Sequence, residues 1–221
     1  GIVGESGSGK STLLKTLYFD QPATSGEATL TMYQNGKANI LEASSQQRRY
    51  LRNHLMGMVY QNPMLGLRMN ISSGANIAEK LIAAGSRNAG RMIARSSQLL
   101  EHVEIPVERL RDQPRVFSGG MQQRVQISKA IANNPPILLL DEVTTGLDLS
   151  VQAKVLDLIR TIQQELGIAM MIVSHDLSVI RMMSDRTMVM LGGRVVEEGL
   201  TDQILEDPLH AYTQTLVSSL L

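Results

Sequence analysis

The chain has 221 residues, enough to bury one substantial core with a subdomain inserted into it. Its 21 lysine and arginine residues balance 21 aspartate and glutamate residues, which argues against a protein drawn to nucleic acid or directly to an anionic membrane surface. It has no cysteine, which excludes disulfides, thiol chemistry and cysteine-ligated metals and is compatible with a reducing cytosol. Its apolar runs fall far short of the roughly 20 residues of a membrane-spanning helix. We therefore expect a soluble, cytoplasmic protein that is membrane-peripheral only through a partner.

A phosphate-binding loop lies near the start of the chain. Residues 4–11 fit the pattern G-x-x-x-x-G-K-[ST], in which glycines let backbone N–H groups turn inward around the phosphates of a nucleotide. Lys10 would reach the outer phosphates, and the Ser11 hydroxyl would complete a Mg²⁺ shell. A helix begins here, so its N-terminus would face the anion. The predicted nucleotide-binding residues of this loop are Gly4, Glu5, Ser6, Gly7, Ser8, Gly9, Lys10, Ser11 and Thr12.

The middle of the chain changes from strand patterns to helix patterns. Alternation over residues 27–33, the turn signal Asn35-Gly36 and residues 38–42 predict a small antiparallel hairpin. A polar helix over 44–53 and a strand over 55–60 follow. The helix carries a basic run, which is either a solvated face or a docking site for an acidic partner: Arg48, Arg49 and Arg52. From about residue 71 to 134, apolar stripes at helical spacing predict several helices.

The second half of the chain alternates strands and helices. Pro135-Pro136 ends the helical region, and the apolar run over 137–140 is typical of a strand buried on both faces. Then come a helix over 151–166, a strand over 168–174, a helix over 177–183 and a strand over 187–191. This alternation predicts an α/β fold: a P-loop nucleoside triphosphatase core with a mostly parallel sheet, a small antiparallel β part and an inserted helical subdomain.

The predicted core consists of residues 1–65 and 135–221, and the helical subdomain of residues 66–134. The chain has no initiating methionine and begins three residues before the phosphate loop. A single short strand end is a poor start for a parallel sheet, so we expect further N-terminal strands to precede Gly1 in the natural protein.

Polar residues follow three of the predicted strands, at the sheet edge where open α/β folds bind ligands. Asp141 can hold Mg²⁺ through water, and Glu142 can orient or deprotonate the attacking water. Gln61 can join the Mg²⁺ shell or hold the water, and His175 can bind the terminal phosphate. Each residue has a plainer alternative: a helix N-cap pair for the two acids, a turn residue for Gln61 and a structural strand end for His175.

A second anion site is predicted at Ser118-Gly119-Gly120, which precedes a long helix with Ser118 as its plausible N-cap. Exposed N–H groups and the positive end of the helix dipole would attract a phosphate. One nucleotide needs only one phosphate loop, so the second site suggests the nucleotide of another copy. The alternative is a simple helix cap.

Together these motifs resemble, in their order along the chain, those of the ATP-binding-cassette (ABC) ATPases. The resemblance covers essentially the whole chain. It implies ATP and Mg²⁺ as cofactors and a head-to-tail dimer, with two ATP molecules held between the phosphate loop of one subunit and the Ser118-Gly119-Gly120 helix of the other. In that picture Glu142 is the general base, His175 is the switch, Met121 continues the second nucleotide-binding motif and Asp148 lies in the loop that crosses the dimer interface. The implied Mg²⁺ ligands are Ser11, Gln61 and Asp141.

Within the family, the chain resembles the ATP-binding subunits of the bacterial carbon–phosphorus lyase system for phosphonate breakdown. The supporting stretches include residues 60–63, 73–79 and 103–106, and the tail over 210–213 is shared with peptide-importer ATPases. The implied partners are a second ABC subunit, in a homodimer, and the carbon–phosphorus lyase core; the alternative is a peptide importer with membrane permease subunits. Val143, Met121 and Phe117 depart from the usual family residues, and the aromatic residue that stacks on adenine lies upstream in the family.

Overall fold

The computed structural model describes residues 1–218 and has one six-stranded sheet at its centre, in the order β2-β3-β4-β1-β5-β6. All neighbouring pairs are parallel except β5 and β6, which are antiparallel. The α/β fold with a mostly parallel sheet is therefore confirmed. The strands are β1 (Ile2–Val3), β2 (Met56–Val59), β3 (Ile137–Asp141), β4 (Ala169–Val173), β5 (Arg186–Leu191) and β6 (Arg194–Leu200).

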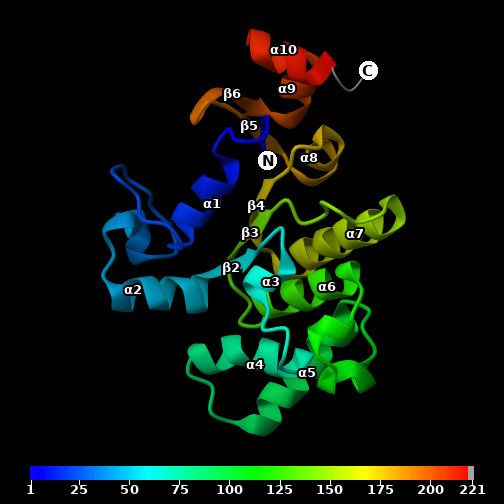
Figure 1. Cartoon of the computed structure of the whole chain (residues 1–221). Coiled ribbons are helices and arrows are strands. Elements are labelled where there is room, and N and C mark those ends of the chain that lie inside the picture. Colours follow the sequence, from blue (N-terminus) through cyan, green and yellow to red (C-terminus); the bar gives the residue numbers. More distant parts are fainter. Residues whose placement is uncertain (219–221) are drawn as a thin grey trace.

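Helices cover both faces of this sheet. Figure 1 shows α1 on one side and α6, α7 and α8 on the other, with α4 and α5 together at the lower end of the view. A π-helical turn, Leu51–Leu55, joins α2 to β2. The helices are α1 (Lys10–Leu17), α2 (Ser45–Tyr50), α3 (Pro63–Gly66), α4 (Ser73–Ala83), α5 (Ala89–His102), α6 (Gly119–Ala130), α7 (Leu149–Leu166), α8 (Leu177–Met183), α9 (Thr201–Glu206) and α10 (Ala211–Ser218).

The core has two hydrophobic layers because side chains of a strand point alternately to opposite faces. In β3, Leu138 and Leu140 join a cluster that includes residues of α4 to α8. Leu139, between them, joins a second cluster with Leu14 of α1. The uninterrupted apolar sequence of β3 is thus explained by burial on both sides, as predicted for a central parallel strand.

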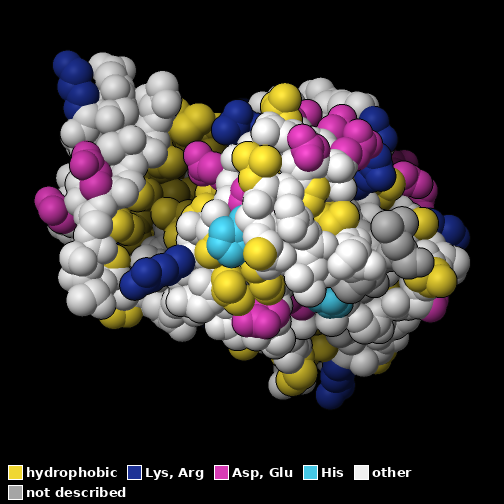
Figure 2. Space-filling view, turned by 90° about the horizontal axis from the view of Figure 1, so that it is seen from above, with side chains coloured by type: hydrophobic (Ala, Val, Ile, Leu, Met, Phe, Trp, Pro, Cys, Tyr) yellow, Lys and Arg dark blue, Asp and Glu magenta, His cyan; other side chains and the backbone are white. Residues whose placement is uncertain are grey.

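The hairpin predicted over 27–42 is wrong, since no strand forms there. The two arms share the backbone bond from Ile40 N to Ala28 O, at 2.8 Å. The Asn39 side chain replaces the rest of the ladder: it donates to Gly26 O and accepts from Ala28 N, both at 3.1 Å. Ile40 is instead buried by packing, and Leu30 partly, around a hollow of 270 Å³ that these two residues line together with the sheet. Figure 2 shows a hollow lined with hydrophobic side chains beside a projecting part of the molecule.

The antiparallel pair lies instead at the other end of the chain. The predicted strand over 187–191 is present as β5, and β6, which was not predicted, pairs with it. Gly192 and Gly193 join the two strands with positive φ angles of 54° and 80°. Two such residues form the turn whose twist suits a tight hairpin. β6 is the edge strand of the sheet, α9 packs against β6 and β5, and Tyr212 of α10 contacts the phosphate loop.

Candidate functional site

The phosphate loop runs from the end of β1 to the start of α1. Gly4, Gly7 and Gly9 have φ angles of 149°, 84° and 100°, which non-glycine residues rarely adopt. A Cβ on Gly4 would lie 2.1 Å from Met190 O, so the loop passes against β5 too closely for any side chain there. Gly9 is the N-cap of α1 and makes no side-chain cap bond. The first N–H groups of α1 therefore remain available to an anion.

Lys10 lies inside this loop rather than in solvent. Its side chain is buried, and Nζ donates to Gly4 O and Glu5 O, both at 2.8 Å. Burial lowers the pKa of Lys10, while the nearby carboxylates of Glu142 and Asp141 raise it in part. A positive charge is thus held at the loop with carbonyl partners that an arriving phosphate can replace.

A hydroxyl and a carboxylate meet next to Lys10. Ser11 Oγ, in the first turn of α1, donates to Asp141 Oδ1 at the end of β3, at 2.6 Å. Burial raises the pKa of Asp141, and the bond from Ser11 opposes that change. Oxygen donors of this kind suit Mg²⁺, which binds proteins through few ligands and keeps several waters. The residues present therefore fit the cation, although residues 1–218 contain no group of three His, Asp or Glu side chains that would form a protein-only metal cage.

Three polar side chains converge on the carboxylate of Glu142. Gln61 Nε2 and Thr145 Oγ1 each donate to Glu142 Oε2 at 3.1 Å. His175 Nδ1 lies 3.3 Å from the same oxygen. The structure thus brings together Gln61, Glu142 and His175, three of the four residues predicted at the strand ends, because parallel β2, β3 and β4 end at the same edge of the sheet. Such a carboxylate, adjacent to the phosphate loop, can accept a proton from a water molecule.

The second predicted anion site lies at the start of α6. Ser118 is its N-cap, and Ser118 Oγ accepts from Met121 N at 3.4 Å. Ser118 and Gly119 are exposed, whereas Gly120 is buried against Val151 of α7. Within residues 1–218, no hydrogen bond or ion pair joins this site to the phosphate loop or the Glu142 cluster. The two predicted anion sites are therefore not bonded to each other in the described part of the chain.

Asp148 also stands apart from the carboxylate cluster. It is the N-cap of α7, where it accepts from Val151 N at 3.0 Å and Ser150 Oγ at 2.8 Å. These bonds lower the pKa of Asp148. Its side chain is exposed close to the Gly120–Val151 contact, so Asp148 and the start of α6 belong to one surface.

Two residues of the site were missed by sequence reasoning. Thr145 lies in the loop after β3, and its side chain contacts Glu142. Tyr212, in α10, accepts a hydrogen bond from the Glu5 backbone N–H at 2.8 Å, so the C-terminal region contacts the phosphate loop. Thr145 lay next to a predicted acid and could have been considered. Tyr212 is far away in the sequence, and no local pattern points to it.

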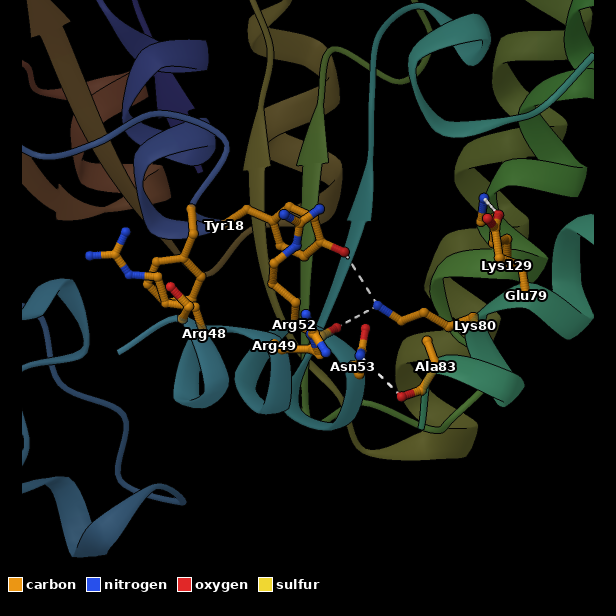
Figure 3. A pocket seen from close by; sticks show the side chains of 11 residues that line it. Tyr18, Arg48, Arg49, Arg52, Asn53, Glu79, Lys80, Ala83 and Lys129 are labelled. Atoms are coloured by element: carbon orange, nitrogen blue, oxygen red, sulfur yellow. Dashed lines mark hydrogen bonds and ion pairs between the residues drawn. The ribbon is translucent and has the colours of Figure 1, made fainter. Parts of the chain in front are cut away.

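A basic pocket of 510 Å³ opens between α1, α2, α4 and α6 (Figure 3). Lys80 is buried there: Nζ donates to Tyr18 Oη at 3.3 Å and to the carbonyls of Arg52 and Met56. Burial, together with the charges of Arg52 and Lys129, lowers the pKa of Lys80 to about 8. Cationic side chains thus outnumber the single lining carboxylate, that of Glu79; they are Arg48, Arg49, Arg52, Lys80 and Lys129.

The fold and the loop define a P-loop nucleoside triphosphatase. Residues 1–145 match the family described as ABC transporter, and the chain belongs to this family of ATP-binding-cassette proteins. It is 48% identical over 221 residues to a protein of Escherichia coli (strain K12) named as a phosphonates utilization ATP-binding protein, PhnK, covering 100% of this chain and 86% of the relative. It is also 38% identical to the oligopeptide transport ATP-binding protein OppF of Lactococcus lactis subsp. lactis (strain IL1403), covering 100% of this chain and 67% of the relative.

Solved structures of ATP-binding cassettes have a similar fold. The dimeric post-hydrolysis structure of the ATP-binding cassette MJ0796, bound to ADP and Pi, matches with a TM-score of 0.79 and 30% identity, covering 90% of this chain and 84% of that chain. The protein is therefore an ABC ATPase that binds and hydrolyses ATP, and cassettes of this fold dimerise. Among residues 1–218, no helix is long and apolar enough to cross a membrane.

Proposed function

We propose that this chain is the ATP-hydrolysing subunit of a carbon–phosphorus lyase system for phosphonate use. The observation that carries the proposal is the greater similarity to the phosphonate-utilisation relative, 48%, than to the peptide-transport relative, 38%. It would not cleave the carbon–phosphorus bond, since the chain has no cysteine to hold an iron–sulfur cluster. Its role is to couple ATP-driven closure of a dimer to the lyase complex.

In the proposed mechanism, the phosphate loop binds the triphosphate through its N–H groups and Lys10. Ser11, Gln61 and Asp141 would hold Mg²⁺, which neutralises phosphate charge when bound. Gln61 donates to Glu142 through its amide nitrogen, and no residue among 1–218 donates to its amide oxygen. That oxygen is therefore free for a cation or a water molecule.

Glu142 is the proposed general base, which accepts the proton of the attacking water. Gln61 and His175, both in contact with its Oε2, connect the base to the ends of β2 and β4. His175 is largely exposed, which fits a switch that contacts the terminal phosphate and releases after hydrolysis. In this arrangement, loss of the phosphate is sensed at the same carboxylate that promoted the reaction.

The proposed assembly is a head-to-tail homodimer. The exposed N-terminus of α6, with Ser118, Gly119, Gly120 and Met121, would bind the phosphates of the partner's ATP. Asp148 would lie in the interface between the subunits. The lack of any bond between the two anion sites within residues 1–218 supports this assembly. We also retain the proposed division into a nucleotide-binding core, residues 1–65 and 135–221, and a helical subdomain, residues 66–134.

The basic pocket supports a partner with an acidic surface. It lies between α2 and α4, so a protein bound there would contact both the proposed core and the proposed helical subdomain. Arg49 is exposed at its rim, and the excess of cationic side chains favours carboxylates on the partner. A movement between the two parts could then be transmitted to the lyase core.

Purification with partners tests the proposed system. Tagged protein is purified from cells grown with a phosphonate as the sole phosphorus source, and the associated proteins are identified by mass spectrometry. We expect soluble lyase subunits with the wild-type chain, their loss with Arg49→Glu, and their retention with Arg91→Glu, which changes an exposed arginine of α5 outside the pocket. Membrane permeases in place of lyase subunits would favour the second candidate, a peptide importer, for which the OppF similarity is the supporting observation.

The proposed chemistry has a separate test. Glu142→Gln keeps the shape of the side chain but removes its basicity. We expect ATP turnover to fall by a factor of about 10² to 10⁴, the usual contribution of a general base, while ATP-bound dimers accumulate in size-exclusion chromatography. Full turnover in this variant would refute the assignment of Glu142.

A further inference from the structure

The contacts of Glu142 fall on only one of its two carboxylate oxygens. Gln61, Thr145 and His175 all contact Oε2, at 3.1, 3.1 and 3.3 Å. Within residues 1–218, no donor lies within hydrogen-bond distance of Oε1. A base needs one oxygen free for the proton that it accepts, so this division leaves Oε1 available. The side chains that fix Oε2 therefore decide where the free oxygen points.

Thr145 differs from the other two because it belongs to the same turn as Glu142. Glu142 has a φ angle of +45°, in the left-handed region that costs a non-glycine residue energy. Two backbone bonds hold this conformation: Glu142 N donates to Val173 O at 3.0 Å, and Thr145 N donates to Glu142 O at 3.1 Å. The turn closed by Thr145 also brings its hydroxyl back to the carboxylate. One residue thus holds both the backbone and the side chain of Glu142.

Gln61 and His175 reach the carboxylate from other strands. Gln61 follows β2 and begins the segment that leads to α3, and 59% of the His175 side chain is exposed. Both side chains can leave Glu142 and contact a nucleotide or a cation instead when these bind. The Thr145 contact depends on no other element than the turn itself, so we expect it to remain when the other two are lost.

We propose that Thr145 is a positioning residue for ATP hydrolysis: its hydroxyl fixes Oε2 of Glu142 so that Oε1 faces the attacking water. The inference rests on the proposed role of Glu142 as base. It predicts a specific kinetic pattern. Loss of the hydroxyl lets the carboxylate rotate, which slows the chemical step but leaves the phosphate loop and Lys10 unchanged. The maximal rate should therefore fall without a matching loss of ATP affinity.

Three single substitutions test this inference. Thr145→Val keeps the branched shape and the backbone N–H but removes the hydroxyl, Thr145→Ser keeps the hydroxyl, and Thr144→Val makes the same chemical change at the neighbouring threonine, for which no contact with Glu142 exists. We expect Thr145→Val to lower kcat about tenfold, the loss of one hydrogen bond to a charged group, with KM for ATP within about twofold. We expect Thr145→Ser and Thr144→Val to stay within about twofold of the wild type in both parameters. Thermal unfolding shows that each variant is folded.

The outcomes separate the inference from the function on which it rests. Unchanged kcat in Thr145→Val, equal losses in Thr145→Val and Thr145→Ser, or a loss that appears in KM rather than kcat would each overturn the positioning role. Glu142→Gln is measured in parallel. If Glu142→Gln is inactive and Thr145→Val is normal, only the Thr145 inference fails; if Glu142→Gln is fully active, the proposed base itself is wrong.

Discussion

The contact between Gly120 and Val151 gives the most specific structural prediction. A Cβ added to Gly120 of α6 would lie 2.4 Å from Cγ1 of Val151 in α7. Atoms at ordinary contact are more than an ångström farther apart. Val151 is β-branched, so its Cγ1 cannot turn away without leaving the preferred helical rotamer. Gly120→Ala must therefore either force Val151 into a strained rotamer or displace one of the two helices.

The size of the effect follows from two opposing terms. Alanine is favoured over glycine inside a helix by about 1 kcal/mol. Overpacking of a well-filled contact costs about 1–3 kcal/mol. We expect a net loss of about 1 kcal/mol in the free energy of unfolding, and a larger loss of ATP turnover because the displaced helix carries Ser118 and its neighbour α7 begins after Asp148.

A double-mutant cycle in urea tests this reasoning. Val151→Ala removes the atom that clashes. The free energy of unfolding that the double variant Gly120→Ala/Val151→Ala loses should therefore be smaller, by about 1 kcal/mol or more, than the sum of the losses of the two single variants. Recovery of part of the ATP turnover should accompany it. Additive losses, or a Gly120→Ala variant as stable as the wild type, would show that the helices are not held at this contact.

The remaining predictions concern the phosphate loop and the basic pocket. Lys10→Met should abolish ATP binding measured by calorimetry, since it removes the charge that the triphosphate meets; retained affinity would count against the loop. Tyr212→Phe removes the hydroxyl that accepts from Glu5 N, and we expect ATP affinity to fall about two- to tenfold, the value of one neutral hydrogen bond; an unchanged dissociation constant contradicts this. Lys80 has a pKa of about 8 in the folded protein, below the 10.5 of the free side chain. Between pH 8 and pH 10.5, the unfolded state therefore binds more protons than the folded state. The free energy of unfolding of the wild type should accordingly rise from pH 8 to pH 10.5 relative to that of Lys80→Met. If the two proteins show the same pH dependence, the lowered pKa of Lys80 is disproved.

The sequence was sufficient for the parts of the fold and site that depend on local patterns. The apolar run of β3 and the helix over 177–183 are local signals, and the structure contains both. The helix before β3 ends at Ala130 rather than at the predicted stop, Pro135-Pro136. The meeting of Gln61, Glu142 and His175 could also be predicted. It needs only the rule that the carboxyl ends of neighbouring parallel strands share one edge of the sheet.

The predictions that failed, and the features that were missed, depend on contacts that a local sequence pattern does not reveal. Residues 27–42 alternate like a strand, but the Asn39 side chain takes the backbone groups that a partner strand would use, and a lone hairpin is marginal. The hairpin of β5 and β6 carried a recognisable signal, Gly192-Gly193, that was overlooked. The bond from Glu5 to Tyr212 joins the two ends of the chain, so only the tertiary structure shows it.

The position of β1 has a consequence for the order of events during folding. This strand lies between β4 and β5, and Ile2 pairs with both Val173 and Met188. β1 must therefore wait until β4 and β5, far along the chain, have been made before it can pair with its neighbours. Closing so long a loop is entropically costly, and such non-local topologies fold slowly. The phosphate loop, which follows β1 directly, thus takes its place in the sheet only after these distant strands have formed.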